Sequence, residues 1–170
     1  IAILAGVVLM VMFADKYPPV RGFEPFLYSL RYSIPGVIIY LVICINLLKG
    51  RSDSHKLLIP QLILVPLGFL FLGYGLITFL NGHNDNSRIT IYEPVLISKY
   101  RQSHDDDPDT YHIKVYSWID EGKYEKMKIP YSLYTKINEG KKDVAIFVKE
   151  GNFKIQWIEK IIKRDNGGRR

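Results

Sequence analysis

The stretch "INLLKGRSDSHKLLIPQLIL", residues 45–64, decides the fold of this chain. Its centre carries four charged residues, Lys49, Arg51, Asp53 and Lys56, between two apolar runs. Residues 32–48 contain no Asp, Glu, Lys or Arg, and neither do residues 57–80. A helix that crosses a bilayer needs about 17 to 25 predominantly apolar residues, and both runs have that length.

A helix that is apolar on every side lies either inside a large core or in lipid. About 90 of the 170 residues remain outside the apolar half, too few to enclose two or three such helices. We therefore interpret the charged stretch as a turn at a membrane face. The predicted helices span about residues 1–14, 26–48 and 57–80.

The first apolar run, "IAILAGVVLMVMFA", is shorter than the other two. Fourteen helical residues span about 21 Å, against a hydrocarbon core of about 30 Å. The run is therefore either the apolar part of a signal peptide or a membrane helix that begins before Ile1. No clear small-residue cleavage site follows it, so we favour the incomplete helix.

Charge divides the chain into an apolar and a water-soluble part. Residues 1–82 carry six of the 23 Lys and Arg and three of the 17 Asp and Glu. We predict a transmembrane region over 1–82, a soluble β domain over 83–164 and a flexible basic tail over 165–170. The net charge of +6 is shared evenly between the two halves, so neither is basic enough to indicate nucleic-acid binding.

The short connections predict an orientation. Three basic residues lie in the turn at 49–56, whereas "DKYPPVRGFEP" has two basic and two acidic residues. Basic residues concentrate in short cytoplasmic loops. The turn is therefore expected in the cytoplasm and the C-terminal domain on the extracytoplasmic side.

Several residues of the apolar half are candidates for helix packing or interaction. Glycines at three positions of the last helix form a strip for close approach, and two polar residues flank the charged turn, where they are interfacial or bonded between helices. One arginine either extends to the interface or pairs with Glu24. These residues are Gly68, Gly73, Gly75, Asn46, Gln61 and Arg31.

The second half has the pattern of strands and turns. "RITIYEPVLISKY" is rich in β-branched and aromatic residues, and "TYHIKVYSWI" turns at "DEG" into "KYEKMKIPY". "SLYTKINEG" predicts one or two helical turns, capped by Ser132 and ended by Gly140. A second hairpin turns at residues 150–152, with Phe153, Ile155 and Trp157 alternating on its return strand. Five strands and one short helix predict a small antiparallel β barrel or curled sheet.

The "WIDEGK" hairpin, Tyr131 and Tyr134 before Gly140, and "EGKKDVAIFVKEG" followed by "FKIQWI" carry a resemblance. The chain resembles small bacterial membrane proteins of unknown function, in which two or three transmembrane helices precede a compact C-terminal β domain. The likeness covers roughly the last 80 residues. It implies the bacterial inner membrane as location and carries over no catalytic residue.

Few residues suggest chemistry. The acidic run "SHDDDPD", residues 103–109, lacks the glycine and distal glutamate of a helix–loop–helix calcium site, so we interpret it as a solvated loop. No serine lies in a glycine elbow, and no phosphate-binding glycine loop is present. We expect no catalytic residue, metal or cofactor. The basic residues Lys160, Lys163 and Arg164 are candidates for interaction with headgroups or an acidic partner.

These patterns favour a non-enzymatic membrane protein. We expect an accessory or scaffolding subunit with the lipid bilayer and other membrane subunits as partners, and a protein ligand for the β domain. One alternative is a membrane immunity or inhibitor protein that acts against a toxin. Another is an envelope enzyme that uses the acidic loop as its site.

Overall fold

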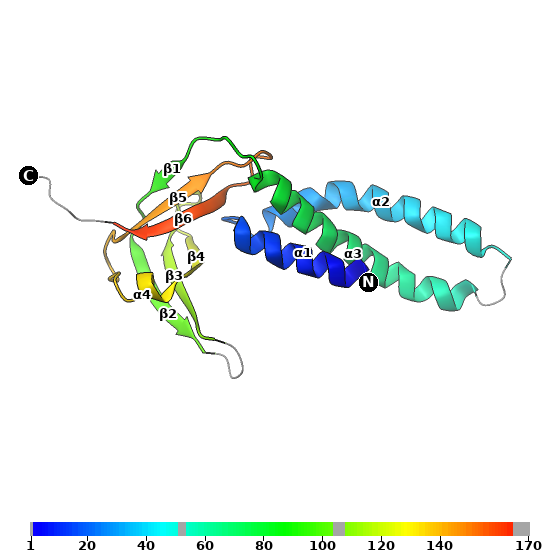
Figure 1. Cartoon of the computed structure of the whole chain (residues 1–170), viewed down its shortest axis with the longest axis horizontal. Coiled ribbons are helices and arrows are strands. Elements are labelled where there is room, and N and C mark those ends of the chain that lie inside the picture. The colour runs from blue at the N-terminus through cyan, green and yellow to red at the C-terminus, as the bar shows by residue number, and fades with distance from the viewer. Residues whose placement is uncertain (1, 51–53, 104–107, 165–170) are drawn as a thin grey trace, which may run out of the picture. The chain divides into compact units, whose positions relative to one another are not determined.

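The computed structural model describes residues 2–50, 54–103 and 108–164 (Figure 1). The chain divides into two compact units. The helical unit comprises residues 1–87 and 150–157, and the β unit comprises residues 88–149 and 158–170. The chain therefore passes between the units three times, after residues 87, 149 and 157.

The helical unit contains α1 (Ala2–Lys16), α2 (Glu24–Leu48) and α3 (Ser54–Gly82). α3 packs against both other helices, as Figure 1 shows. α2 begins at Glu24 with a proline in its first turn, a position where the missing N–H costs nothing. The observed helices begin and end within about three residues of the predicted bounds.

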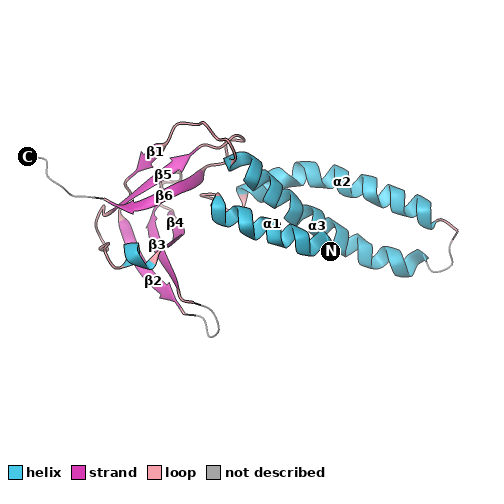
Figure 2. Cartoon of the chain, viewed as in Figure 1, coloured by secondary structure: helices cyan, strands magenta, loops and turns pink. Residues whose placement is uncertain are grey.

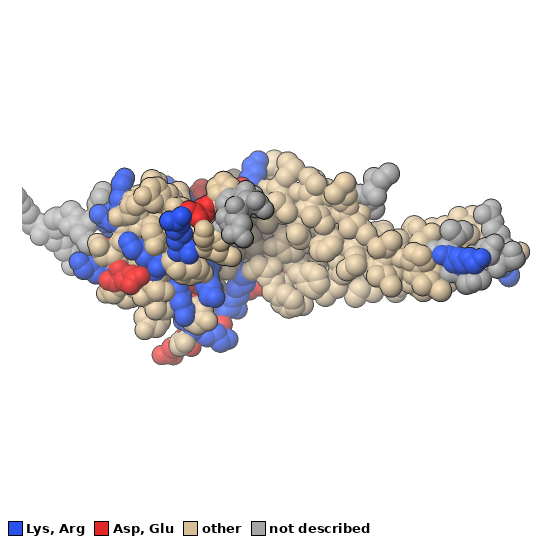
Figure 3. Space-filling view, turned by 90° about the horizontal axis from the view of Figure 1, so that it is seen from below, with Lys and Arg blue, Asp and Glu red and all other residues tan. Residues whose placement is uncertain are grey.

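Within the described residues, two helices are long and apolar enough to cross a membrane, Glu24–Leu48 and Leu58–Gly82. Each has 25 residues, and their mean hydropathies are 1.7 and 2.2. Only 6% and 22% of their most apolar windows are buried. Few charged side chains are visible over the middle of the helical unit on the face that Figure 3 displays. α1 has 15 residues, which extend about 22 Å.

The β unit contains two three-stranded antiparallel sheets (Figure 2). One has the order β1 (Thr90–Tyr92), β5 (Val144–Lys149), β6 (Trp157–Lys163). The other has the order β2 (Leu96–Gln102), β3 (Thr110–Tyr116), β4 (Tyr124–Ile129). A single turn of helix, α4 (Tyr131–Tyr134), follows β4.

The core of the β unit is aliphatic. Alternate residues of β3 and β4 point into it, as the two-residue period of a strand requires, and β5 is buried along most of its length. The side chains of this core that are fully buried are Leu96, Ile113, Val115, Ile137, Val144, Ile146 and Val148. Leu133 of α4 is also buried there.

Three details differ from the sequence prediction. The segment "RITIYEPVLISKY" forms two strands, β1 and β2, because Pro94 has no N–H to donate to a sheet. The short helix is preceded by Pro130 in an extended conformation, so Ser132 is not its cap. The predicted return strand of the second hairpin is wrong for Phe153 and Ile155, because β6 begins only at Trp157.

Candidate functional site

The most extensively bonded group of polar residues in the helical unit joins the end of α3 to the segment 150–157. We call this group the clasp, defined by Asn81, Asp85, Gly151, Asn152 and Trp157. A helix end leaves backbone carbonyls without partners inside the helix. The Asn152 side-chain amide donates to two of them, Leu80 O at 2.8 Å and His83 O at 2.9 Å.

Asn81 binds the returning segment on two sides. Its side-chain amide donates to Ile155 O at 2.7 Å, and its oxygen accepts from the Phe153 amide at 2.9 Å. Its side chain is buried, so these bonds replace bonds to water. Gly151 has φ +74°, and an added Cβ there would collide with the Asn81 amide. These bonds hold the backbone of 153 and 155, which explains why these residues form no strand.

Asp85 completes the clasp with a carboxylate that accepts four hydrogen bonds. Two come from Ser87, from its N at 2.8 Å and its Oγ at 3.0 Å. The others come from Gly151 N at 3.2 Å and Trp157 Nε1 at 2.8 Å. Burial opposes ionisation of this group, but the bonds from Ser87, Trp157 and Gly151 outweigh it and lower the pKa of the carboxyl. A carboxylate held in this way is a structural acceptor and a poor general base.

Aromatic rings surround the clasp. Tyr17, just after α1, meets Trp157 edge to face with centroids 5.3 Å apart and also contacts Phe79. An added Cβ at Gly82 would collide with the Tyr17 ring, so this glycine permits the approach. Tyr28 of α2 stacks on Phe153 at 5.0 Å. The clasp therefore ties residues near the end of α1, the start of α2 and the end of α3 to one segment.

The three candidate glycines of α3, Gly68, Gly73 and Gly75, lie at or near its helix contacts. A Cβ added at Gly75 would lie 2.9 Å from the backbone nitrogen of Met10, on α1. The same addition at Gly73 would lie 2.7 Å from Ser33 Oγ, on α2. Gly68 is buried, and a Cβ added at Gly6 of α1 would lie 3.1 Å from the Gly68 carbonyl oxygen. α3 therefore approaches the backbone of α1 and the serine side chains of α2.

The three polar candidates of the helices, Gln61, Asn46 and Arg31, do not form one cluster. Gln61 Oε1 accepts from Tyr40 Oη at 3.3 Å, which joins α3 to α2. Asn46 donates to Val42 O, four residues earlier in the same helix. Arg31 is exposed. Glu24, the residue with which it was predicted to pair as one alternative, has its Oε1 atom 3.8 Å from Nη1 of Arg21.

The basic candidates of β6 are not brought together at one site. Lys160 Nζ lies 4.4 Å from the centroid of Phe147, and Lys163 is exposed. Arg164 pairs with Glu93 at 3.0 Å. The basic tail at 165–170 lies outside the described residues.

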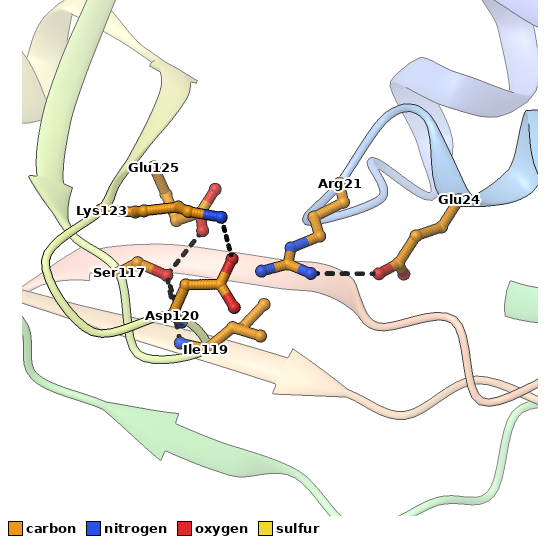
Figure 4. Close-up of polar contacts among 7 residues, drawn as sticks. All are labelled: Arg21, Glu24, Ser117, Ile119, Asp120, Lys123 and Glu125. Carbon is orange, nitrogen blue, oxygen red and sulfur yellow. Dashed lines mark hydrogen bonds and ion pairs between the residues drawn. The ribbon is translucent and has the colours of Figure 1, made fainter.

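A pocket of about 300 Å³ lies in the β unit, where Tyr92 and Trp118 stack at 5.0 Å. Trp118 Nε1 is buried there and has no hydrogen-bond partner among the described residues. Figure 4 shows the adjoining turn, where Ser117 Oγ donates to Glu125 at 2.7 Å and accepts from the amides of Ile119 and Asp120. A serine bonded in this way stabilises a turn.

No group of three metal-ligating side chains occurs among residues 2–50, 54–103 and 108–164. Most of the acidic run, His104 to Asp107, lies outside these ranges. Asp109 pairs with Arg101. Only weak signals of the clasp are present in the sequence: Asn81 ends an apolar run, and Asp85 precedes Ser87 with the spacing of an Asx turn.

Comparison of the chain with protein-family models, curated proteins and solved structures gives no match.

Proposed function

We propose that this chain is a non-enzymatic integral membrane protein, an accessory or scaffolding subunit that packs beside other membrane proteins and presents a β interaction domain. The observation that carries the proposal is the outward apolar surface of α2 and α3. The core helix of a soluble protein hides its apolar side chains, whereas these helices expose theirs along most of their length. The exposed side chains include Ile34, Ile38, Ile39, Val42, Ile43, Ile59, Leu62, Ile63, Leu67 and Leu76.

The helix contacts support lateral packing rather than transport. The close approaches at Gly73 and Gly75 use small residues, which membrane helices use to pack together. The described parts of α2 and α3 contain no acidic side chain after Glu24, so they offer no carboxylate for a proton or cation path. The polar side chains of the clasp bond to one another and to neighbouring groups of the helical unit, which suits a structural role.

The finer assignment belongs to the same proposal. α1, α2 and α3 form a three-helix membrane unit, and the two sheets form a curled, barrel-like domain. The basic turn at 49–56 lies in the cytoplasm, by the excess of Lys and Arg in that short connection. The β unit then lies on the extracytoplasmic side of a bacterial inner membrane, and its ligand is a protein.

Site-specific photocrosslinking in membranes tests the proposal. Membranes are first washed at alkaline pH, and the chain is expected to stay in the pellet. A photoreactive residue at Ile39, which is 61% exposed, should then give an adduct with one discrete membrane protein. The same residue at the buried Ile77 is the matched control and should give none. Release of the chain by the wash would contradict membrane insertion. Adducts of the probe at Ile39 with lipid alone would contradict the presence of a partner subunit.

A further inference from the structure

One face of the β2–β3–β4 sheet is basic and aromatic. The strand register places Tyr100 beside His112 and His112 beside Lys128 in one row, and Ser98, Lys114 and Lys126 in the next. Tyr116 and Tyr124 form a third row. The opposite face supplies the buried Ile113, Val115, Met127 and Ile129. We call the first set the basic face, which comprises Ser98, Tyr100, His112, Lys114, Tyr116, Tyr124, Lys126 and Lys128.

No ion pair between described residues neutralises the lysines of the basic face. Lys114 lies directly opposite Lys126, a pairing of like charges that destabilises a sheet. None of the eight residues of the face is acidic, and none of the ion pairs between described residues involves its lysines. Elsewhere in the β unit, Lys123, Lys149 and Arg164 are paired with carboxylates.

The Tyr124 ring contacts two of the three lysines of the basic face. Lys114 Nζ lies 3.5 Å from the centroid of Tyr124, and Lys126 Nζ lies 5.9 Å from it. Tyr100 stacks on His112 with the rings 13° from parallel. The face is therefore an ordered aromatic platform whose positive charge is not neutralised by the described residues of the chain. Such a platform fits a partner that carries several negative charges.

We propose that the basic face binds the phosphate headgroups of anionic lipids. This inference rests on the proposed membrane function, because three chain crossings then tether the β unit to helices in the bilayer. Because a tethered domain stays close to the bilayer, the effective concentration of lipid headgroups around it is high. Tyrosine and lysine are also the side chains that favour the membrane–water interface, where basic residues are attracted to anionic headgroups.

The test uses the full chain in vesicles of phosphatidylcholine with increasing phosphatidylglycerol. Cys44 is replaced by Ser, and a Cys at the exposed Gln102, on the same side of β2 as Tyr100, carries an environment-sensitive dye. The dye signal is expected to shift with the phosphatidylglycerol fraction and to return at high salt. Each lysine near an anionic surface contributes about fivefold, so changing Lys114, Lys126 and Lys128 to Gln should lower the bound-to-free ratio on the order of 100-fold.

A matched variant distinguishes binding by the basic face from a general effect of net charge. Changing the exposed Lys136, Lys141 and Lys142 to Gln removes the same charge and should leave the shift within about threefold of the parent. Equal loss in both variants overturns the proposal. So does a shift caused by poly-glutamate or a single-stranded oligonucleotide in pure phosphatidylcholine vesicles, with none from phosphatidylglycerol.

The outcome also distinguishes this inference from the proposed function. A chain that an alkaline wash removes from the vesicles defeats membrane insertion itself. A chain that stays inserted and shows no response to phosphatidylglycerol defeats only lipid binding by the basic face. Thermal unfolding of the triple variant should match the parent or exceed it, because removing opposed like charges does not weaken the sheet.

Discussion

Replacing Asp85 by Ala should release the segment 150–156 from the end of α3. The carboxylate accepts one bond from Gly151 N and one from Trp157 Nε1 across this joint. A hydrogen bond to a charged group contributes about 1.5 to 3 kcal/mol, and a buried donor left without a partner costs about 1 to 3 kcal/mol. Because Asp85 is only 8% exposed, we expect a loss of about 3 to 5 kcal/mol in the free energy of unfolding the clasp.

Fluorescence of Trp157 measures this loss. The full chain, with Trp118 changed to Phe, is unfolded in mixed micelles by increasing amounts of a denaturing detergent. Hydrogen exchange at the amides of Gly151, Asn152 and Phe153 should accelerate in the same variant, because their acceptors belong to the clasp. Asp85→Asn keeps the shape and one acceptor oxygen, so it should fall between the parent and Asp85→Ala.

The pH dependence of stability gives a second measurement of the role of Asp85. The pKa of Asp85 is lower in the folded chain than its ordinary value, so its ionised form contributes stability. That contribution is complete above about pH 5 and is lost as the pH falls through the lowered pKa. Asp85→Asn should remove this part of the acid sensitivity. A change below about 0.5 kcal/mol in Asp85→Ala, with unchanged exchange, would refute the reasoning.

Three further predictions follow from the helices and the loop. Gly75→Ala should destabilise the helical unit by about 1 to 2 kcal/mol in detergent unfolding, because its Cβ meets the backbone of α1, whereas Gly22→Ala meets no atom within 4 Å and should be neutral. A Cys at Ser103, with Cys44 removed, should react with a membrane-impermeant thiol reagent in intact cells, and labelling only after lysis would reverse the orientation. Millimolar calcium, magnesium or zinc should leave the melting temperature unchanged, and a saturable rise that vanished when the aspartates of 105–109 became asparagines would make the loop a site.

The helices were predictable because their signal is local. An uncharged run such as 57–80 specifies a helix by its own composition, and α3 extends it by two to three residues at each end. The alternating strands β3 and β4 were predictable for the same reason, since Ile113 and Val115 lie two apart and face the core.

The clasp was not predictable, because its bonds join residues about 70 positions apart. The alternation of Phe153, Ile155 and Trp157 has the period of a strand, but the Asn81 side chain takes the Phe153 N–H and the Ile155 carbonyl. A side chain that far away in sequence leaves no trace in the local pattern. β5 also pairs with β1, on its side away from β6, and this pairing is non-local in the same sense.

The last prediction concerns the β unit alone. Its fully buried side chains, such as Leu96, Ile113 and Val144, all come from residues 88–149, so a fragment of residues 87–164 should fold with a strand-dominated circular dichroism spectrum. The fragment lacks Asn81 and Asp85, however, and these residues hold the connection between β5 and β6.

The amides of 151–153 should therefore exchange freely in the fragment and be protected in the full chain, while the amides of β3 stay protected in both. A change of Asn81 to Ala in the full chain is the matched control, since it should expose Phe153 N without removing the helices. Because Trp157 belongs both to the clasp and to the first position of β6, its loss of anchorage should also loosen the start of that strand. Equal protection of 151–153 in fragment and full chain would mean that the β unit orders this segment by itself, and that the clasp is not what fixes it.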